Sequence, residues 1–449
     1  MAKGGNKTIK VNYLARVEGE GALTVRFRSG QVEDLQLKIF EPPRFFEAFL
    51  RGRSALEVAD ITARICGICP IAYQMSAVYA VEQALGVTVE EPVALLRRLL
   101  YCGEWIESHA LHVYMLHAPD YLGYPDVVAM AKDYQREVER GLAIKKAGNA
   151  IVAILGGREI HPINVRVGGF YRLPLRKELD SLLELLQRAL DAACDGVRWV
   201  SAFTFTQAKA PPELVALQPI RSAGDYPMCE GRIISSSGIN ADVGDFERTF
   251  EEIQVPYSNA LHSIVKGGGS YLTGPLARFH LHQSKLAPRA LDLISECGRH
   301  QVDLNQYNPS HSIVIRSLEI VHALDTAIAA IKSYEVPAEA CKKFELKSGT
   351  GMAATEAPRG LLYHRYCLDA DGRILDAKIV PPTSQNQRAI EDELRMILAG
   401  KSAMPKSALS QLCEQAIRNH DPCISCATHF LKLTILDLDG LSGIEASAT

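Results

Sequence analysis

The chain has 449 residues and a formal net charge of −3, and 47% of its residues are hydrophobic. A chain of this length exceeds the size at which a single core stops growing, so we expect several packed lobes that can bury a deep site. No run of lysines and arginines would serve as a nucleic-acid footprint, so nucleic acid is not an expected partner. No stretch has the roughly 18 apolar residues of a membrane-spanning helix, and the first residues lack the apolar segment of a signal peptide.

The eleven cysteines are an odd number scattered along a long chain. Disulfide frameworks are typical of short secreted chains with an even number of cysteines, whereas free thiols are typical of a reducing compartment. The composition therefore predicts a cytoplasmic protein.

Residues 8–39 alternate polar and apolar side chains, and a Ser-Gly pair at positions 29–30 interrupts the alternation. Period-two alternation around such a pair predicts strands joined in a hairpin. Between the strands, residues 16–19 read Arg-Val-Glu-Gly, where the glycine indicates a turn or a close approach of two backbones. From these residues alone, Glu18 is most simply a solvated turn carboxylate.

Helical periodicity dominates the chain from residue 55 to residue 200 and returns near residue 286. The middle, about residues 201–285, is turn-rich and reads as an irregular lobe, while residues 343–381 alternate again and predict a second sheet. The expected helices span residues 70–85, 91–117, 127–154, 175–200, 286–299, 303–333, 387–399 and 406–419.

These elements predict an α+β fold in which long helices form a central bundle and two small β-sheets lie at its periphery. The expected parts are an N-terminal β part at 8–39, a helical core at about 55–200 and 286–333, a second β part at about 343–381, and a C-terminal metal-binding segment at 406–429.

Two Cys-x-x-Cys pairs lie almost at opposite ends of the chain: Cys66 with Cys69, and Cys423 with Cys426. A two-residue spacer lets both sulfurs of a pair reach one ion, and four thiolates together make a soft metal site. Such a pair is a structural zinc half-site or a redox dithiol at least as often as a catalytic transition-metal site. Zinc ribbons place their second pair about 15–20 residues after the first, whereas more than three hundred residues separate these pairs. A site built from both ends of a chain is more typical of an active centre, but spacing alone leaves the three alternatives open.

The residues that flank the cysteines carry a stronger signal. Residues 64–70 read Arg-Ile-Cys-Gly-Ile-Cys-Pro, and residues 421–429 read Asp-Pro-Cys-Ile-Ser-Cys-Ala-Thr-His. Both closely resemble the signature motifs of nickel-iron hydrogenase large subunits, and further similar segments run from residue 13 to residue 429. Residues 13–21 are most similar to sequences of the cytoplasmic, NAD(P)-linked and sulfhydrogenase-like branch of this family. Tyr73 also resembles that branch, because many other relatives have histidine at this position.

The resemblance implies an oxidoreductase that cleaves H2 reversibly and heterolytically into protons and electrons. It also implies a role for each cysteine. Cys66 and Cys423 would be terminal ligands of nickel. Cys69 and Cys426 would bridge nickel to an iron that also carries carbon monoxide and cyanide.

The resemblance assigns further residues around these metals. Glu18 would be the first proton acceptor, beside the terminal nickel ligand Cys423. Arg359, on its own an ordinary turn arginine, would lie over the open metal position and share the role of base with a terminal thiolate. Asp421 would orient Arg359, and Thr383 would donate a hydrogen bond to a cyanide.

A magnesium site near the C-terminus is also implied by the resemblance. Its ligands would be Glu47, which could otherwise form a surface ion pair, the carbonyl of Ile379, and His429. Precursors in this family are cut after the matching histidine by a nickel-dependent maturation endopeptidase, so residues 430–449 are expected to be removed.

Three histidines, His109, His112 and His117, lie on one predicted helix, where i, i+3 spacing places the first two on one face. We expect them to pack and hydrogen-bond around the metal pocket, because four thiolates leave no need for an imidazole ligand.

Electrons released from H2 must be transferred away from the metals, which requires further redox centres. The other seven cysteines stand alone in the sequence and are interpreted as small buried residues rather than as ligands of such a centre. The resemblance therefore implies an iron-sulfur small subunit, together with flavin- and NAD(P)-binding subunits and additional iron-sulfur subunits. The alternatives are another cytoplasmic acceptor such as sulfur, polysulfide or another electron carrier, a metal-free scaffold related to a respiratory-complex subunit, or a zinc-stabilised interaction protein.

Overall fold

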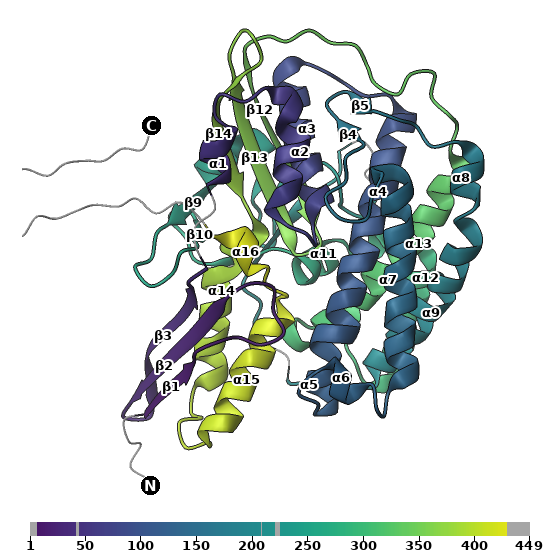
Figure 1. Ribbon diagram of the computed structural model, residues 1–449. Helices are drawn as coiled ribbons and strands as arrows, with labels where there is room; N and C mark the ends of the chain where they lie inside the picture. The colour runs from purple at the N-terminus through teal and green to yellow at the C-terminus, as the bar shows by residue number, and fades with distance from the viewer. Residues whose placement is uncertain (1–6, 42–44, 208, 221–224, 429–449) are drawn as a thin grey trace, which may run out of the picture.

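A computed structural model describes residues 7–41, 45–207, 209–220 and 225–428, and the architecture is shown in Figure 1. The expected magnesium ligand His429 and the expected extension 430–449 lie outside the described residues. Long helices form one side of the molecule, and two three-stranded sheets lie on the other side, so the predicted α+β fold class is confirmed.

Four long helices form the centre of the bundle: α4 (Glu91–Ala110), α7 (Gln135–Gly156), α9 (Leu183–Ser201) and α13 (Ser312–Ser333). Helix α13 is buried along almost its whole length, as expected for a helix that is apolar on most of its faces. Helices α4 and α7 cross at Gly103 and Gly148, where a Cβ on Gly148 would meet the Gly103 carbonyl oxygen at 2.6 Å. The two glycines therefore permit the close contact that fixes α7 against α4.

Helix α4 continues into a π-helical turn, Leu111–His117, before α5 begins. Such turns are rare and are found frequently at functional sites. The remaining helices are α1 (Phe46–Leu50), α2 (Val58–Thr62), α3 (Pro70–Leu85), α5 (Ala118–Leu122), α6 (Val127–Met130), α8 (Arg176–Asp180), α10 (Phe246–Thr249), α11 (Pro275–His282), α12 (Pro288–Cys297), α14 (Pro382–Leu398), α15 (Lys406–Asn419) and α16 (Ile424–Ala427).

The two predicted sheets are both present and antiparallel. The first contains β1 (Lys7–Val11), β2 (Gly21–Arg28) and β3 (Gln31–Ile39), and its apolar face packs on α14 and α15. The second contains β12 (Gly349–Ala357), β13 (Gly360–Leu368) and β14 (Ile374–Val380), and it packs on α3. Gly351 lets β12 approach α3, because a Cβ there would meet the Ala80 carbonyl oxygen at 1.9 Å.

The number of sheets is larger than the two we expected. The middle of the chain, read as irregular, contains a four-stranded sheet in the order β11-β6-β7-β8, in which β11 pairs with β6 in parallel. Its strands are short, so period-two alternation extends over too few residues to detect. In addition, β6 pairs with β11, which is distant in sequence, and no local pattern indicates such a partner. The strands of the additional sheets are β4 (Val165–Arg166), β5 (Gly169–Phe170), β6 (Glu213–Gln218), β7 (Arg232–Ser235), β8 (Asn240–Ala241), β9 (Phe250–Ile253), β10 (His262–Val265) and β11 (Tyr271–Leu272).

A buried ionic cluster joins the bundle to the second sheet. Arg278 on α11 donates two 2.9 Å hydrogen bonds to Glu319 on α13 and one of 3.1 Å to Glu356 on β12, and all three side chains are fully buried. The same guanidinium donates to the carbonyls of Ala357 and Pro358 and lies 4.4 Å over the Trp105 ring. This cluster therefore fixes the turn that immediately precedes Arg359.

Within the described ranges, no helix combines the length and the apolar composition needed to cross a bilayer.

The buried cluster predicts a stability difference between two charge-neutralising substitutions. Glu319→Gln removes the carboxylate that accepts two of the three ionic hydrogen bonds of Arg278 and leaves Glu356 as its remaining anionic partner. Breaking a buried ion pair completely costs about 3–5 kcal/mol, so the loss here should approach that range from below. Asp191→Asn removes a partner of the exposed Arg289 pair, which spans 3.3 Å, and exposed pairs contribute at most about 1 kcal/mol. Thermal unfolding of the two variants should show a clear decrease in unfolding temperature for Glu319→Gln only, and equal unfolding temperatures would contradict the role given to the cluster.

Candidate metal centre

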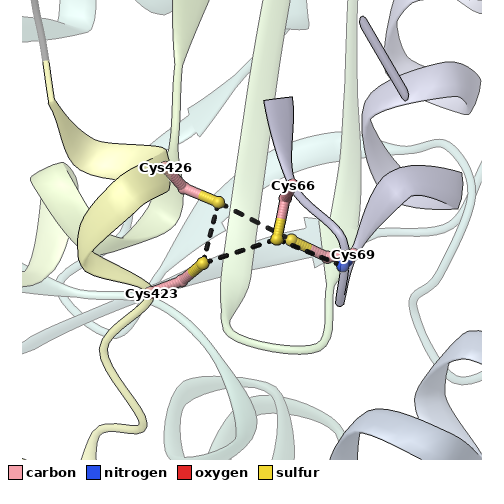
Figure 2. Close-up of side chains that lie close together, drawn as sticks. All are labelled: Cys66, Cys69, Cys423 and Cys426. Atoms are coloured by element: carbon pink, nitrogen blue, oxygen red, sulfur yellow. Dashed lines mark hydrogen bonds between the residues drawn. The ribbon is translucent and has the colours of Figure 1, made fainter. Parts of the chain in front are cut away.

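The four cysteines converge into one pocket. Their sulfur atoms all lie within 4.8 Å of one another. The Cys66 and Cys423 sulfurs are 3.6 Å apart, and those of Cys69 and Cys426 are 3.8 Å apart. Figure 2 shows the two pairs extending from opposite sides of the pocket toward one another. The prediction that both ends of the chain build one site is therefore supported by the observed geometry.

Local structure directs each pair into the pocket. Cys69 is the residue before α3, with Pro70 at the first helical position, and Cys423 is the residue before α16. The carboxylate of the buried Glu104 accepts hydrogen bonds from the backbone amides of Ile71 at 2.6 Å and Ala72 at 3.1 Å. Glu104 thus satisfies amides at the start of α3 that have no partner within the helix. No sequence pattern indicates this contact, because Glu104 reaches α3 from another helix.

Glu18 lies beside Cys423, as the resemblance implied. Its Oε2 atom is 3.0 Å from the Cys423 sulfur and accepts a 3.1 Å hydrogen bond from the Ser425 amide. The Glu18 carbonyl accepts a further hydrogen bond from the Ile424 amide at 2.9 Å. Gly19 has a φ of +87°, and a Cβ there would lie 2.8 Å from the Ser425 nitrogen. The glycine predicted to allow close approach of two backbones therefore does so against the C-terminal cysteine segment.

Arg359 and Asp421 form a buried pair next to the sulfurs. The Arg359 Nε atom donates to the Asp421 carbonyl at 2.9 Å and lies 3.2 Å from its Oδ2 atom, while His112 Nδ1 lies 3.0 Å from Oδ1. Burial opposes the charge on Arg359, but Asp421 and the sulfurs raise its pKa well above the usual range. Within the described chain, the Nη1 atom of Arg359 is buried without a hydrogen-bond partner.

The Thr383 side chain fixes the backbone at Cys423. Its Oγ1 atom accepts a 3.0 Å hydrogen bond from the Cys423 amide. A hydroxyl has one proton to donate in addition to its acceptor sites, so this contact leaves the expected donation to a bound group open. Thr383 and Arg359 also line a cavity of about 10 Å³ together with Cys69, Tyr73, Ala357, Pro382, Cys423 and Cys426.

The pKa values of the thiols are those expected of a pocket that needs a bound cation to hold four thiolates. Burial raises the pKa of the Cys423 thiol, and the neighbouring sulfurs raise it further. Burial also raises the pKa of Cys426, whereas hydrogen bonding by Cys423 and the other sulfurs lowers that of Cys66. The pocket therefore accommodates one thiolate more readily than four. Four soft donors at this spacing, beside the unpartnered Arg359 Nη1 atom, suit a soft transition metal that would balance their charge.

An ionic clamp that sequence reasoning missed anchors both segments that meet at the sulfurs. Arg418 donates to Asp120 through Nε at 2.6 Å and through Nη2 at 2.7 Å, and also to the Ala15 carbonyl at 2.9 Å. Asp120 forms a second ion pair with Arg16. The clamp therefore ties the segment before Glu18 to the segment before Asp421. Arg418 and Asp120 are 298 residues apart in sequence, so no local pattern could have indicated the pair.

The three histidines of the predicted helix lie outside the sulfur cluster. His109 contacts Glu319 at 2.9 Å, His112 contacts Asp421, and His117 lies 3.1 Å from the Asn419 side chain. They therefore pack around the pocket as we expected, His109 and His112 through close contacts with carboxylates and His117 through a hydrogen bond.

Two of the three expected magnesium ligands lie next to each other. Glu47 Oε1 accepts a 2.7 Å hydrogen bond from the Ile379 amide, which is the amide of the residue whose carbonyl we expected to bind the ion. The third expected ligand, His429, lies outside the described residues.

Comparisons with known proteins agree with this site. The family described as nickel-dependent hydrogenase matches residues 44–140 and 270–429. Sulfhydrogenase 2 subunit alpha of Pyrococcus furiosus is 34% identical over 433 residues, which cover 95% of this chain and 100% of that protein. NAD-reducing hydrogenase HoxS subunit beta of Cupriavidus necator is 25% identical, and the match covers 95% of both chains.

A solved structure is similar over the same length. The structure of an NAD+-reducing NiFe-hydrogenase in the H2-reduced state has a TM-score of 0.82 and 25% sequence identity. The match covers 94% of this chain and 99% of that chain. The structural similarity therefore covers nearly the whole chain, and the family match includes both cysteine pairs.

Proposed function

Because the chain belongs to the nickel-dependent hydrogenases, we propose that it is the catalytic large subunit of a nickel-iron hydrogenase that cleaves H2 heterolytically and reversibly. The electrons would pass through an iron-sulfur small subunit to a flavin-containing module that reduces NADP+ or NAD+. The observation that carries the proposal is the convergence of four buried sulfurs, from two pairs at opposite ends of the chain, within 4.8 Å.

The four thiolates would hold nickel and iron. Cys66 and Cys423 would be terminal ligands of nickel, and Cys69 and Cys426 would be shared with an iron that carries carbon monoxide and cyanide. When bound, the two metals supply the Lewis acidity that polarises H2 and the capacity to accept its electrons. A closed four-sulfur zinc site would have no open coordination position for a substrate, which disfavours the alternative of a zinc-stabilised interaction protein.

The protein side chains would move the proton. Cleavage of H2 yields two protons and two electrons, and the thiolate of Cys423 is the proposed acceptor for the first proton. Glu18 Oε2 lies 3.0 Å from that sulfur, within the distance at which a carboxylate can accept a proton directly. The resemblance also implied Arg359 as a base, but its guanidinium is paired with Asp421 and guanidinium groups stay protonated in proteins. Arg359 would therefore supply positive charge and a hydrogen-bond donor rather than accept the proton.

A magnesium ion near the C-terminus and proteolytic maturation belong to the same proposal. Glu47, the Ile379 carbonyl and His429 would bind the ion. Removal of residues 430–449 by a maturation endopeptidase would leave His429 as the last residue. The adjacency of Glu47 and Ile379 supports the location of this site.

The partners and the compartment are inferred from the relatives. Both relatives described above are named as subunits, and one is a subunit of an NAD-reducing hydrogenase. Among the described residues, the four cysteines are the single group of three or more His, Cys, Asp or Glu side chains close enough to share an ion, which supports iron-sulfur clusters on other chains. Flavin would be bound by a further subunit, as the resemblance implies. The eleven unpaired cysteines support a cytoplasmic location. Sulfur, polysulfide or another carrier remains the second candidate for the electron acceptor.

Purification of the native complex tests the metal content and the acceptor together. We expect one nickel and one iron in the large subunit, additional iron from the iron-sulfur subunits of the complex, and H2-dependent reduction of NADP+ or NAD+. Cys426→Ser should remove the activity and the nickel and iron of the large subunit, whereas Cys413→Ser, which changes a buried cysteine on α15 outside the pocket, should retain them. Zinc alone with no oxidation of H2 would contradict the proposed function, and H2 oxidation with sulfur but neither nucleotide would favour the second acceptor.

The proton relay predicts that Glu18→Gln loses turnover while the metals stay bound. An amide cannot carry the proton, and a positioned acid or base contributes at least about 100-fold to the rate, so H2-dependent dye reduction should decrease by that factor. Glu20→Gln is the matched control, because Glu20 lies two residues away on the same segment and is exposed. Full activity of Glu18→Gln, with unchanged nickel content, would refute the relay.

A further inference from the structure

The loop that carries Glu18 is closed by a hydrogen bond at its base. The Leu14 amide donates to the Gly21 carbonyl at 2.8 Å. Within this loop, Arg16 has a φ of +58°, which is a left-handed conformation that is uncommon for a residue other than glycine. Strained backbone of this kind persists only where the surrounding structure holds it, and it is concentrated at functional sites. The contacts that hold Arg16 therefore also determine the shape of the loop around Glu18.

The end of the helix bundle holds the Arg16 side chain. Its Nη1 atom donates to the Leu116 carbonyl at 2.7 Å, and its Nη2 atom donates to the Asp120 carboxylate. Leu116 belongs to the π-helical turn, and Asp120 belongs to α5, which follows directly. The side chains of Arg16 and Asp120 are 14% and 3% exposed, and solvent screens buried pairs much less than exposed ones. The loop is therefore held by one hydrogen bond to the main chain and one largely buried ion pair.

Asp120 is itself fixed from the C-terminal side of the site. Arg418, in the segment before Cys423, donates to both carboxylate oxygens of Asp120, at 2.6 and 2.7 Å. Asp120 therefore lies between two guanidinium groups. Burial lowers the pKa of Arg16 and the charge of Arg418 lowers it further, whereas Asp120 raises it. Loss of the Arg16 charge would leave Asp120 paired with Arg418, so a substitution of Arg16 would release the loop without releasing the cysteine segment.

We propose that Arg16 is a positioning residue for proton transfer: its guanidinium, held by Asp120 and the Leu116 carbonyl, fixes the loop so that the Glu18 carboxylate stays beside the Cys423 sulfur. The inference rests on the proposed function, because it concerns the proton that passes from Cys423 to Glu18. Those two side chains are 3.0 Å apart, and a displacement of about 1 Å can cost about 100-fold in rate. Arg16 would thus act on the transfer of the proton and not on the binding of the metals.

Three substitutions of Arg16 separate the ion pair from the backbone conformation. Arg16→Gln removes the charge and shortens the side chain, so the contact with Asp120 is lost. Arg16→Gly also loses this contact but relieves the backbone strain, whereas Arg16→Lys keeps a charge that can pair with Asp120. Arg28→Gln is the matched control, because Arg28 lies on the neighbouring strand β2 and forms an exposed pair with Glu33 at 2.9 Å.

The first readout needs no bound metal. The Ile424 amide donates to the Glu18 carbonyl at 2.9 Å, and the Ser425 amide donates to its Oε2 atom at 3.1 Å. Deuterium exchange of these two amides in the full-length chain reports whether the loop stays docked. We expect faster exchange in Arg16→Gln and Arg16→Gly, slower exchange in Arg16→Lys than in either of them, and no change in the control. Unchanged exchange in Arg16→Gln and Arg16→Gly would overturn the assignment of Arg16.

The second readout separates proton transfer from cleavage of H2 in the assembled hydrogenase. Conversion of para-H2 into ortho-H2 requires cleavage and recombination at the metals, whereas formation of HD from D2 in ordinary water also requires exchange of the proton with solvent. HD formation should decrease by about 10- to 100-fold in Arg16→Gln and Arg16→Gly, and Arg16→Lys should recover part of it. Para-H2 conversion and nickel content should remain at the level of the control.

The two readouts distinguish failure of this inference from failure of the proposed function. A parallel decrease of HD formation, para-H2 conversion and nickel content in Arg16→Gln would overturn the inference, because it would show a merely structural role. HD formation in Arg16→Gly at the wild-type rate would also overturn it, because backbone conformation alone would then suffice. Absence of both hydrogen reactions from the wild-type complex would instead overturn the proposed function.

Discussion

Mutual repulsion among four buried sulfurs is the constraint on which this structure depends. Thiolates within 4.8 Å of one another, with so little solvent around them, need positive charge and hydrogen-bond donors to remain ionised. The protein supplies a buried guanidinium from Arg359 and backbone amides from Ile68 and Cys69, which donate to the Cys66 sulfur at 3.3 and 3.4 Å. These donors do not neutralise four charges, and a bound cation would complete the balance. The site thus has the composition of a metal centre rather than of a dithiol.

The scaffold holds the C-terminal cysteine pair by contacts at nearly every residue that surrounds it. Arg418 pairs with Asp120, the Asn419 carbonyl accepts a 2.9 Å hydrogen bond from Arg316, and His420 contacts Glu393 at 2.8 Å. Asp421 has a φ of +49°, a conformation uncommon for a residue other than glycine, and Arg359 and His112 hold it there. These contacts come from helices far apart in the chain. The helices and the turn between β12 and β13 that holds Arg359 therefore act together to position the C-terminal cysteine pair.

Sequence patterns were sufficient for the long helices and for singling out the four cysteines that converge, and insufficient for the contacts that organise them. Helix α9 and the hairpin of β2 and β3 carry strong periodic patterns, so their existence follows from local physics. The strands β6 and β11 are short and pair across more than fifty residues, which no local pattern encodes. At the site, the flanking motifs indicated Glu18 and Arg359 through their resemblance to a family. Glu104, Asp120 and Arg418 carried no such signal, because their roles depend only on which helices pack together.

The central claim is that the four sulfurs hold one nickel-containing centre, and nickel K-edge X-ray absorption of the anaerobically purified complex tests it most directly. The account predicts a nickel environment dominated by sulfur, since all four available ligands are thiolates. It also predicts that Cys66→Ser replaces one of those sulfurs by a lighter atom or abolishes nickel binding. A nickel environment made of nitrogen and oxygen atoms, or one unchanged in Cys66→Ser, would contradict the account.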